Sequence, residues 1–150
     1  MIEVGAKAPE FTLRDQDGEE VSLADFQGRK VLLVFYPLDF SPVCSDQLSI
    51  YQEVKPELGE KGVELLGISV DSHWAHKAFQ EKLGIDTRLL ADFEPKGEVA
   101  RAYGSYLDGA GIANRTLVLV DEDGNVAWTY ESPTPGEFPG ANLIFDALGA

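Results

Sequence analysis

The sequence predicts an α/β protein in which a central mixed β-sheet is flanked by helices. Two apolar runs carry most of this prediction, Val31–Tyr36 and Val63–Val70, and β-branched residues are frequent in both. Neither run alternates regularly with polar residues, which is typical of strands buried on both faces. A segment with helix-start signals follows each run, so strand and helix alternate through the first half of the chain.

Shorter segments complete the expected sheet. They share a strand-like composition and are bounded by turn residues: Phe11–Leu13, the segment that begins at Val21, Arg88–Ala91, Thr116–Val120 and Val126–Tyr130. Asp17-Gly18 and Asp123-Gly124 are two-residue turn signals, so the first two of these segments and the last two should form hairpins. The antiparallel hairpins, added to the alternating strands and helices, make the expected sheet mixed.

Four helices are expected, and the first has the clearest start. Ser41 is a preferred N-cap residue, and Pro42 is favoured at the first helical position. Pro56 should kink or interrupt this helix. The other three helical segments run from Ser72 to about Leu83, from Gly97 to Tyr103 and from Ala141 to Leu148. Residues 132–140 are rich in Pro and Gly and should form a loop before the last helix.

Length and composition restrict the function. The chain has 150 residues and no internal repeat, which suits a single domain over residues 1–150. Its net charge of −14 argues against nucleic acid and anionic membranes as partners, since both attract Lys and Arg. No apolar run approaches the roughly 20 residues of a transmembrane helix, and no signal-peptide pattern is present. A single cysteine cannot form an internal disulfide, which is compatible with a cytoplasmic location.

The single cysteine, Cys44, occupies the third position of the helix that Ser41 should cap. First-turn N–H groups lack intrahelical partners, and the helix carries about half a positive charge at this end, so both favour the nucleophilic thiolate. The Ser41 hydroxyl can donate toward the sulfur or toward an oxygen bound to it. Pro37 follows the strand, lacks an N–H and has a fixed φ, so it can wall the site without competing for hydrogen bonds. These features predict a reactive thiol and leave its substrate open.

The segment Phe35–Cys44, with the sequence FYPLDFSPVC, resembles the signature of the peroxiredoxin family. That signature consists of Pro, three residues, Thr or Ser, two residues and the peroxidatic Cys, and Pro37, Ser41 and Cys44 match it in type and spacing. Gln47 stands where the family often has Glu or Gln. The resemblance extends over nearly the whole chain, through Gly5–Phe11, Gly67–Ser72 and Asn114–Thr116.

The resemblance implies a thioredoxin-like fold with peroxiredoxin insertions, and it places the family's active-site arginine at Arg115. Cys44 is then the catalytic residue, supported by Ser41, Arg115 and Pro37. Ser49 occupies the position at which some members of the bacterioferritin-comigratory group carry a resolving cysteine. Together with the stretches 71–84, 89–104 and 109–115, this makes the chain most similar to the one-cysteine AhpE group.

The resemblance also implies the chemistry, which is a thiol peroxidase that reduces hydrogen peroxide and organic hydroperoxides without a cofactor or a metal. Cys44 would become a sulfenic acid and would need an external thiol to reduce it. This reductant would be a thioredoxin-, glutaredoxin- or mycoredoxin-like protein or a low-molecular-weight thiol. A homodimer is implied as well. Four aromatic residues are candidates for its contact or for the pocket mouth, and ordinary core or surface packing is an equally good explanation for each of them: Phe40, Trp74, Phe93 and Tyr106.

Three alternative functions fit parts of the sequence. A thioredoxin-like binding module would have this fold without a reactive Cys44. A disulfide oxidoreductase usually needs Cys-x-x-Cys, whose first position is Ser41 here. A cysteine hydrolase would pair Cys44 with His73 or His76, and the spacing of these histidines could also hold a metal. A polar helix face is the more ordinary expectation for both histidines. Residues 121–125 hint at a calcium loop but lack the later Glu, so a hairpin turn is expected there.

Overall fold

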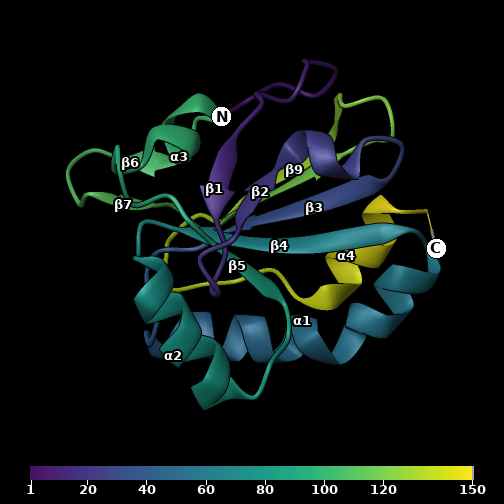
Figure 1. Cartoon of the computed structure of the whole chain (residues 1–150). Helices are drawn as coiled ribbons and strands as arrows, with labels where there is room; N and C mark the ends of the chain where they lie inside the picture. Colours follow the sequence, from purple (N-terminus) through teal and green to yellow (C-terminus); the bar gives the residue numbers. More distant parts are fainter. Residues whose placement is uncertain (150) are drawn as a thin grey trace.

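A seven-stranded mixed sheet organises the computed structural model, which describes residues 1–149 (Figure 1). The strands of this sheet, in chain order, are β1 Thr12–Arg14, β2 Glu20–Ser22, β3 Lys30–Phe35, β4 Val63–Ser69, β5 Arg88–Ala91, β8 Thr116–Val120 and β9 Val126–Glu131. Their order across the sheet is β2-β1-β5-β4-β3-β8-β9. A separate two-stranded sheet pairs β6 Tyr106–Leu107 with β7 Ile112–Ala113.

The centre of the large sheet is parallel, and its margins are antiparallel. β3 pairs in parallel with β4, and β4 pairs in parallel with β5. β8 lies antiparallel on the other side of β3, and the expected hairpins β1–β2 and β8–β9 form the two edges. In the turn of the second hairpin, Oδ1 of Asp121 accepts hydrogen bonds from the N–H groups of Asp123 and Asn125, each at 3.0 Å. The mixed sheet and the hairpin turn are thus confirmed.

Helices cover the two faces of the sheet unequally. Within residues 1–149 they are the 3-10 helix η1 Leu23–Phe26 and the α-helices α1 Pro42–Glu60, α2 His73–Leu83, α3 Glu98–Ala102 and α4 Ala141–Ala147. Figure 1 shows α1, α2 and α4 together on one face, with α3 and the β6–β7 pair toward the other. None of the helices in this part of the chain is long and apolar enough to cross a membrane.

Strand β3 contributes to the cores on both faces. Val31, Leu33 and Phe35 pack in the core that includes η1 and α3, whereas Leu32 and Val34 pack in the core beneath α1, α2 and α4. All five side chains are almost completely buried. Because successive side chains of a strand point to opposite faces, a strand between two cores has no polar side, and this explains the continuous apolar run in the sequence.

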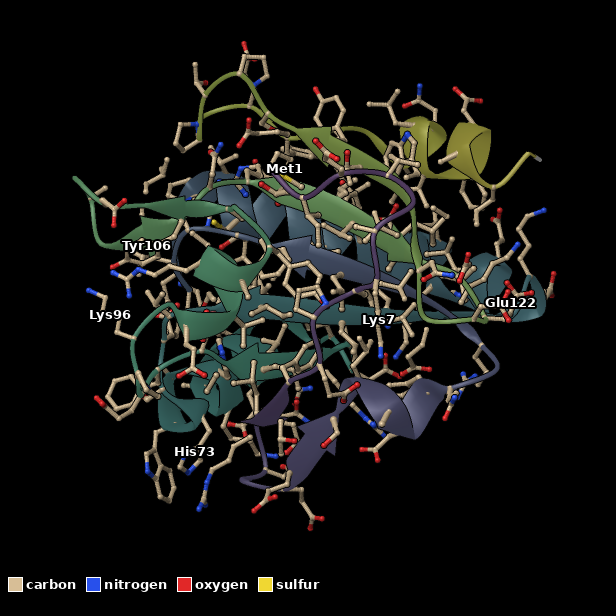
Figure 2. The ribbon with its side chains drawn as sticks, turned by 90° about the horizontal axis from the view of Figure 1, so that it is seen from above. Met1, Lys7, His73, Lys96, Tyr106 and Glu122 are labelled. Atoms are coloured by element: carbon tan, nitrogen blue, oxygen red, sulfur yellow. The ribbon has the colours of Figure 1, made fainter. Side chains whose placement is uncertain are left out.

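The N-terminal segment covers part of the face that bears η1 and α3. Figure 2 shows it crossing over the sheet from Met1 past Lys7. The N–H of Gly5 donates to the carbonyl of Val126 at 2.8 Å, and Ala8 is buried in the core of this face. The segment therefore supplies cover that the longer helices supply on the opposite face.

Three details differ from the expectations. Helix α1 continues through Pro56 to Glu60, so the proline does not interrupt it. Leu58, beyond the proline, is fully buried in the core beneath α1, and this packing holds the last turn although Pro56 cannot donate a hydrogen bond. The very short η1 and β6–β7 were not expected, because elements of two to four residues show no usable periodicity. Strand β1 begins at Thr12, one residue later than expected.

Gly67 lies in the middle of β4, at a point where a side chain does not fit. A Cβ atom there would come within 2.8 Å of Leu89 and 3.3 Å of Tyr36. Gly67→Ala should therefore lower the free energy of unfolding by about 1–3 kcal/mol, as overpacking of a core does. Urea denaturation measures the change. The control is Gly59→Ala on α1, where nothing lies within 4 Å of the added Cβ and helix propensity predicts a small gain. An equal loss in both variants would contradict the steric explanation.

Candidate active site

The candidate site begins at the N-terminus of α1. Ser41 has an extended backbone, and its Oγ accepts a hydrogen bond from the N–H of Cys44 at 3.2 Å. Pro42 is the first helical residue, so Cys44 is the third, as the sequence predicts. The oxygen of Ser41 is thus engaged with the backbone of the first turn, whereas the hydrogen-bond donor to the sulfur comes from a different part of the chain.

Cys44 is completely buried, and its sulfur faces a guanidinium group. Nη2 of Arg115 donates to Sγ of Cys44 at 3.3 Å. Strand pairing explains how two residues so distant in sequence meet. Phe35, the last residue of β3, pairs with Thr116, the first residue of β8. Arg115 directly precedes β8, and the chain after β3 leads into α1, so both reach the same end of the sheet.

Arg115 is 1% exposed, and each of its three donor nitrogens has a defined partner. Besides the sulfur, these are the side-chain oxygen of Gln47, 2.6 Å from Nη1, and the carbonyl of Pro135, 2.9 Å from Nε. Arg115 forms no ion pair with an Asp or Glu of residues 1–149, although the chain is strongly acidic. A buried cation without an anion is costly. Of the three hydrogen-bond partners of Arg115, only the sulfur of Cys44 belongs to an ionisable side chain.

Two further residues of α1 support the guanidinium. Nε2 of Gln47 donates to the hydroxyl of Tyr51 at 3.2 Å, and that hydroxyl donates to the carbonyl of Pro139 at 2.7 Å. Burial raises the pKa of Tyr51 to about 12, so its hydroxyl keeps the proton that it donates. Cys44, Gln47 and Tyr51 are three and four residues apart and therefore share one face of the helix. The sequence singles out Gln47 only through the family resemblance and does not single out Tyr51. The spacing of three and four residues is the signal in the sequence that connects them to Cys44.

Gln47 should matter through Arg115, because it accepts the shortest hydrogen bond of the guanidinium. Gln47→Leu removes this acceptor and should lower the second-order rate constant of Cys44 oxidation by about 10-fold, as loss of orientation does. Stopped-flow oxidation by hydrogen peroxide measures it. Gln52→Leu is the control on the same helix, since Gln52 contacts Asp86 and Thr87 instead. A similar loss in both variants would show that Gln47 has no specific role.

Pro37 is buried directly after β3 and Tyr36. It begins the loop that connects β3 to Ser41, so it belongs to the segment that leads to Cys44. Its role as a wall of the site stays a prediction.

The histidines of α2 lie outside the set of residues that hydrogen-bond to Cys44 and Arg115 in the described part of the chain. His76 is completely buried, with Nδ1 2.7 Å from Oδ2 of Asp39 and Nε2 2.9 Å from the carbonyl oxygen of Leu90. The expectation of a polar helix face is therefore wrong for His76, which shares the inward face of α2 with Phe79. Among residues 1–149, neither histidine hydrogen-bonds to Cys44, so the pairing required by a cysteine hydrolase is not formed.

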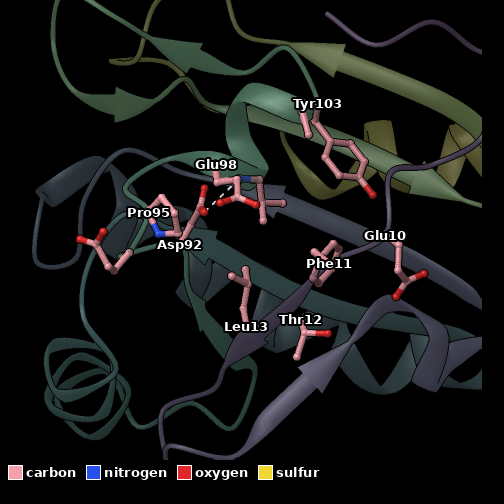
Figure 3. Close-up of a pocket in the computed structure, with 11 residues that line it drawn as sticks. Glu10, Phe11, Thr12, Leu13, Asp92, Pro95, Glu98 and Tyr103 are labelled. Atoms are coloured by element: carbon pink, nitrogen blue, oxygen red, sulfur yellow. Dashed lines mark hydrogen bonds between the residues drawn. The ribbon is translucent and has the colours of Figure 1, made fainter.

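Three surface cavities lie away from the thiol. The cavity in Figure 3, of about 150 Å³, separates the segment from Glu10 to Leu13 from α3. Four carboxylates line it: Glu10, Asp92, Glu94 and Glu98. Two others measure about 480 Å³ and about 180 Å³, and neither of them includes Cys44 or Arg115 in its lining. The candidate active site is therefore identified by the buried sulfur and its hydrogen-bond donor, and none of these three cavities marks its position.

Comparison with known proteins identifies the family of this chain. A model of the AhpC/TSA family matches residues 4–129. Alkyl hydroperoxide reductase E of Mycobacterium tuberculosis (strain H37Rv) is 42% identical over 151 residues, covering 100% of this chain and 98% of the relative. The putative peroxiredoxin bcp of Coxiella burnetii is 39% identical over 132 residues, or 84% and 86% of the two chains. The crystal structure of Enterococcus faecalis AhpC matches with a TM-score of 0.91 at 30% identity, over 99% and 92% of the chains.

The family model covers most of the chain. The thioredoxin-like fold of the chain matches that of the solved relative. The relatives are named as peroxiredoxins or hydroperoxide reductases, and this chain carries one cysteine. The chain therefore belongs to the AhpC/TSA family of peroxiredoxins, as a one-cysteine thiol peroxidase similar to alkyl hydroperoxide reductase E.

Proposed function

We propose that Cys44 is the peroxidatic residue and that it reduces hydrogen peroxide and organic hydroperoxides. One observation carries the assignment: the sulfur of the only cysteine is 3.3 Å from a buried guanidinium that has no carboxylate partner in residues 1–149. The thiolate attacks the terminal oxygen, and an S–O bond forms as the O–O bond breaks. The electron pair of that bond leaves with the second oxygen, which takes up a proton and departs as water or an alcohol. The sulfur is oxidised to a sulfenic acid while the peroxide is reduced.

The residues around the sulfur have separate tasks in this proposal. Negative charge moves from the sulfur to the leaving oxygen, and fixed donors near both positions lower the barrier. Arg115 is a permanent cation that first holds the thiolate and then faces the developing charge. Ser41 orders the first turn and keeps its own O–H free for an oxygen on the sulfur. The N–H of Val43, at the second helical position, has no intrahelical acceptor and is a further donor. Pro37 walls the site.

The sulfenic acid needs an external reductant. The sequence has no second cysteine to form an internal disulfide. The reductant in this proposal is a thioredoxin-, glutaredoxin- or mycoredoxin-like protein or a low-molecular-weight thiol, and the cytoplasm supplies such thiols. Further oxidation to the sulfinic acid is the competing route when the reductant is scarce. No cofactor or metal enters the cycle. Residues 1–150 form one domain in this proposal. A single sheet contains both β1 and β9, and the site combines residues of α1 with the residue that precedes β8.

The test uses prereduced protein and one equivalent of hydrogen peroxide, followed by intact mass and peptide mapping. We expect a gain of one oxygen on Cys44, an adduct when dimedone is present, and loss of the oxygen on addition of a dithiol. An unmodified Cys44, or oxygen on Met1 alone, would overturn the proposal and favour a thioredoxin-like binding module.

A homodimer is the second part of the proposal, and exposed aromatic side chains support it. Trp74 is 77% exposed, Phe93 54% and Phe40 45%. Trp74 and Phe93 line the groove of about 480 Å³. Exposed large apolar groups close together are typical of an interface between proteins. Sedimentation equilibrium should show a dimer that Trp74→Lys weakens, whereas Val4→Lys makes the same charge change at a residue 62% exposed elsewhere. A monomeric wild type would contradict this part alone.

A further inference from the structure

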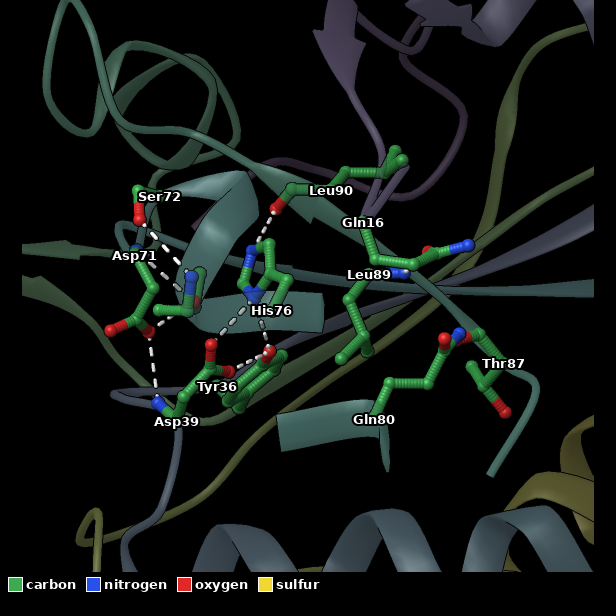
Figure 4. Close-up of polar contacts among 12 residues, drawn as sticks. Gln16, Tyr36, Asp39, Asp71, Ser72, His76, Gln80, Thr87, Leu89 and Leu90 are labelled. Atoms are coloured by element: carbon green, nitrogen blue, oxygen red, sulfur yellow. Dashed lines mark hydrogen bonds and ion pairs between the residues drawn. The ribbon is translucent and has the colours of Figure 1, made fainter. Parts of the chain in front are cut away.

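Asp39 lies at the centre of a buried polar network in the loop between β3 and α1. It is 8% exposed and precedes the N-cap Ser41 by two residues. Oδ1 of Asp39 accepts a hydrogen bond from the hydroxyl of Tyr36 at 2.6 Å, and Oδ2 lies 2.7 Å from Nδ1 of His76. Figure 4 shows the side chains of Tyr36 and His76 converging on Asp39. The loop that leads to the thiol is thus tied to the end of β3 and to α2.

The backbone of Asp39 is fixed as well. Its N–H donates to Oδ2 of Asp71 at 2.8 Å, and the hydroxyl of Ser69 donates to the same oxygen at 2.5 Å. Asp71 follows β4, so a third element holds the loop. The five residues are called the Asp39 network below: Tyr36, Asp39, Ser69, Asp71 and His76.

Proton positions in the network follow from its partners. Nε2 of His76 lies 2.9 Å from the carbonyl of Leu90, which only accepts, so Nε2 carries a proton. The 2.7 Å contact between Nδ1 and Asp39 then holds one further proton between them, and both side chains are almost fully buried. Burial, with the nearby charge of Asp39, raises the pKa of Tyr36 well above its ordinary value, so the hydroxyl remains a donor. The contacts of the Asp39 carboxylate with Tyr36 and His76 are therefore short hydrogen bonds in a buried environment, where water does not compete for them.

The network does not resemble a metal site, although one oxygen or nitrogen each from Asp39, Asp71 and His76 lie within 4.8 Å of one another. A cation would need both the Nδ1 atom and the Asp39 oxygen that now contact each other at 2.7 Å. Oδ2 of Asp71 already accepts two hydrogen bonds. These groups satisfy one another, which is the pattern of a structural network.

The residue next to Asp39 is strained. Phe40 has φ of +69°, and among residues 1–149 it is the one non-glycine residue with a positive φ. This left-handed conformation costs a side chain with a Cβ roughly 1–2 kcal/mol, and it persists only where the surrounding structure holds it. Phe40 lies between the anchored Asp39 and the N-cap Ser41, so its conformation sets the direction in which the chain enters α1.

We propose that the Asp39 network is a positioning device for the thiol, which holds Phe40 in its left-handed conformation and thereby sets Cys44 against Arg115. None of the five network residues hydrogen-bonds to the sulfur. They act through the loop, and a misplacement of about 1 Å at a reacting atom can cost up to about 10²-fold in rate. The inference rests on the proposed peroxidase function, and it adds residues whose identity the family signature does not specify.

The first test measures the second-order rate constant of Cys44 oxidation by hydrogen peroxide in Tyr36→Phe and Asp39→Ala. We expect losses of about 10-fold and about 10²-fold. Tyr36→Phe removes one hydroxyl and leaves the ring, so it keeps the test informative where Asp39→Ala does not fold. Circular dichroism and the urea midpoint establish the fold of each variant. A folded Tyr36→Phe that reacts within twofold of the wild type would overturn the proposal.

The second test is a rescue that a purely structural role would not produce. Glycine adopts positive φ without steric cost. The double variant Tyr36→Phe/Phe40→Gly should therefore have a second-order rate constant of Cys44 oxidation at least about threefold higher than that of Tyr36→Phe alone. Leu38→Gly is the matched control, because it loosens the same loop at a residue without positive φ. Equal rescue by both glycines, or none by Phe40→Gly, would overturn the proposal. A wild type as slow as free cysteine would instead refute the peroxidase function, so the two failures are distinguishable.

Discussion

Cys44→Ser should abolish peroxide turnover while the protein keeps its fold. The expected loss is at least about 10³-fold, to the background of the assay, because a serine hydroxyl at neutral pH is not an anion and cannot replace the thiolate as nucleophile. The change replaces the sulfur with a smaller oxygen atom at a completely buried position. The serine oxygen can still accept from Arg115 but carries no negative charge, so the variant should fold and unfold at a somewhat lower temperature than the wild type. Steady-state consumption of hydrogen peroxide with a dithiol reductant measures the activity.

The control for this prediction is Ser49→Ala, which changes a partly buried position on the same helix, one turn beyond the thiol. It should leave turnover within about twofold, as expected for a residue that contacts neither the sulfur nor the guanidinium. Turnover by Cys44→Ser close to that of the wild type would mean that the peroxide reacts elsewhere, and the assignment of the nucleophile would be wrong.

Arg115→Met should have the second largest effect. Methionine keeps much of the buried volume but removes the charge and all three hydrogen bonds, to Cys44, Gln47 and Pro135. The rate constant for peroxide should fall by about 10²–10³-fold, the usual cost of removing a donor aimed at developing charge. Alkylation of Cys44 by iodoacetamide should also slow, because the cation beside the sulfur is gone, and it measures the reactivity of the sulfur without peroxide.

Arg115→Lys separates charge from geometry. Lysine keeps a positive charge but cannot bind the sulfur and Gln47 with one planar fork, so we expect a rate between those of the wild type and Arg115→Met. Arg101→Met is the matched control, since Arg101 lies over the ring of Tyr106 and its side chain is 53% exposed. Equal rates for wild type and Arg115→Met, in folded protein, would show that the guanidinium does not assist the reaction.

The local part of the site could be predicted from the sequence. The N-cap at Ser41, the proline at the first helical position and the third-position cysteine depend on neighbouring residues only, and the structure confirms all three. The same holds for the strands from Val31 and Val63, whose apolar runs are long enough to be recognised. Local signals of this kind survive in the folded chain because the tertiary structure agrees with them.

The long-range part could not be derived from local patterns. Arg115 reaches Cys44 because β8 pairs with β3 in one register, and spacing along the chain does not give that register. The carbonyls of Pro135 and Pro139 come from a loop with no regular structure, so their contacts with Arg115 and Tyr51 leave no sequence signal. The inward orientation of His76 likewise depends on how α2 packs, and a polar face was the wrong expectation. All of these are tertiary contacts, and those of Arg115 and Tyr51 complete the thiol site.

The most direct measurement is the rate at which prereduced wild-type protein reacts with hydrogen peroxide, followed by tryptophan fluorescence in stopped flow. Buried Cys44 beside an uncompensated guanidinium should react orders of magnitude faster than free cysteine at the same pH, and Cys44→Ser should give no transient. Arg115→Met should give a slow one. A wild-type rate equal to that of free cysteine would contradict the claim that this pair forms a peroxidatic site.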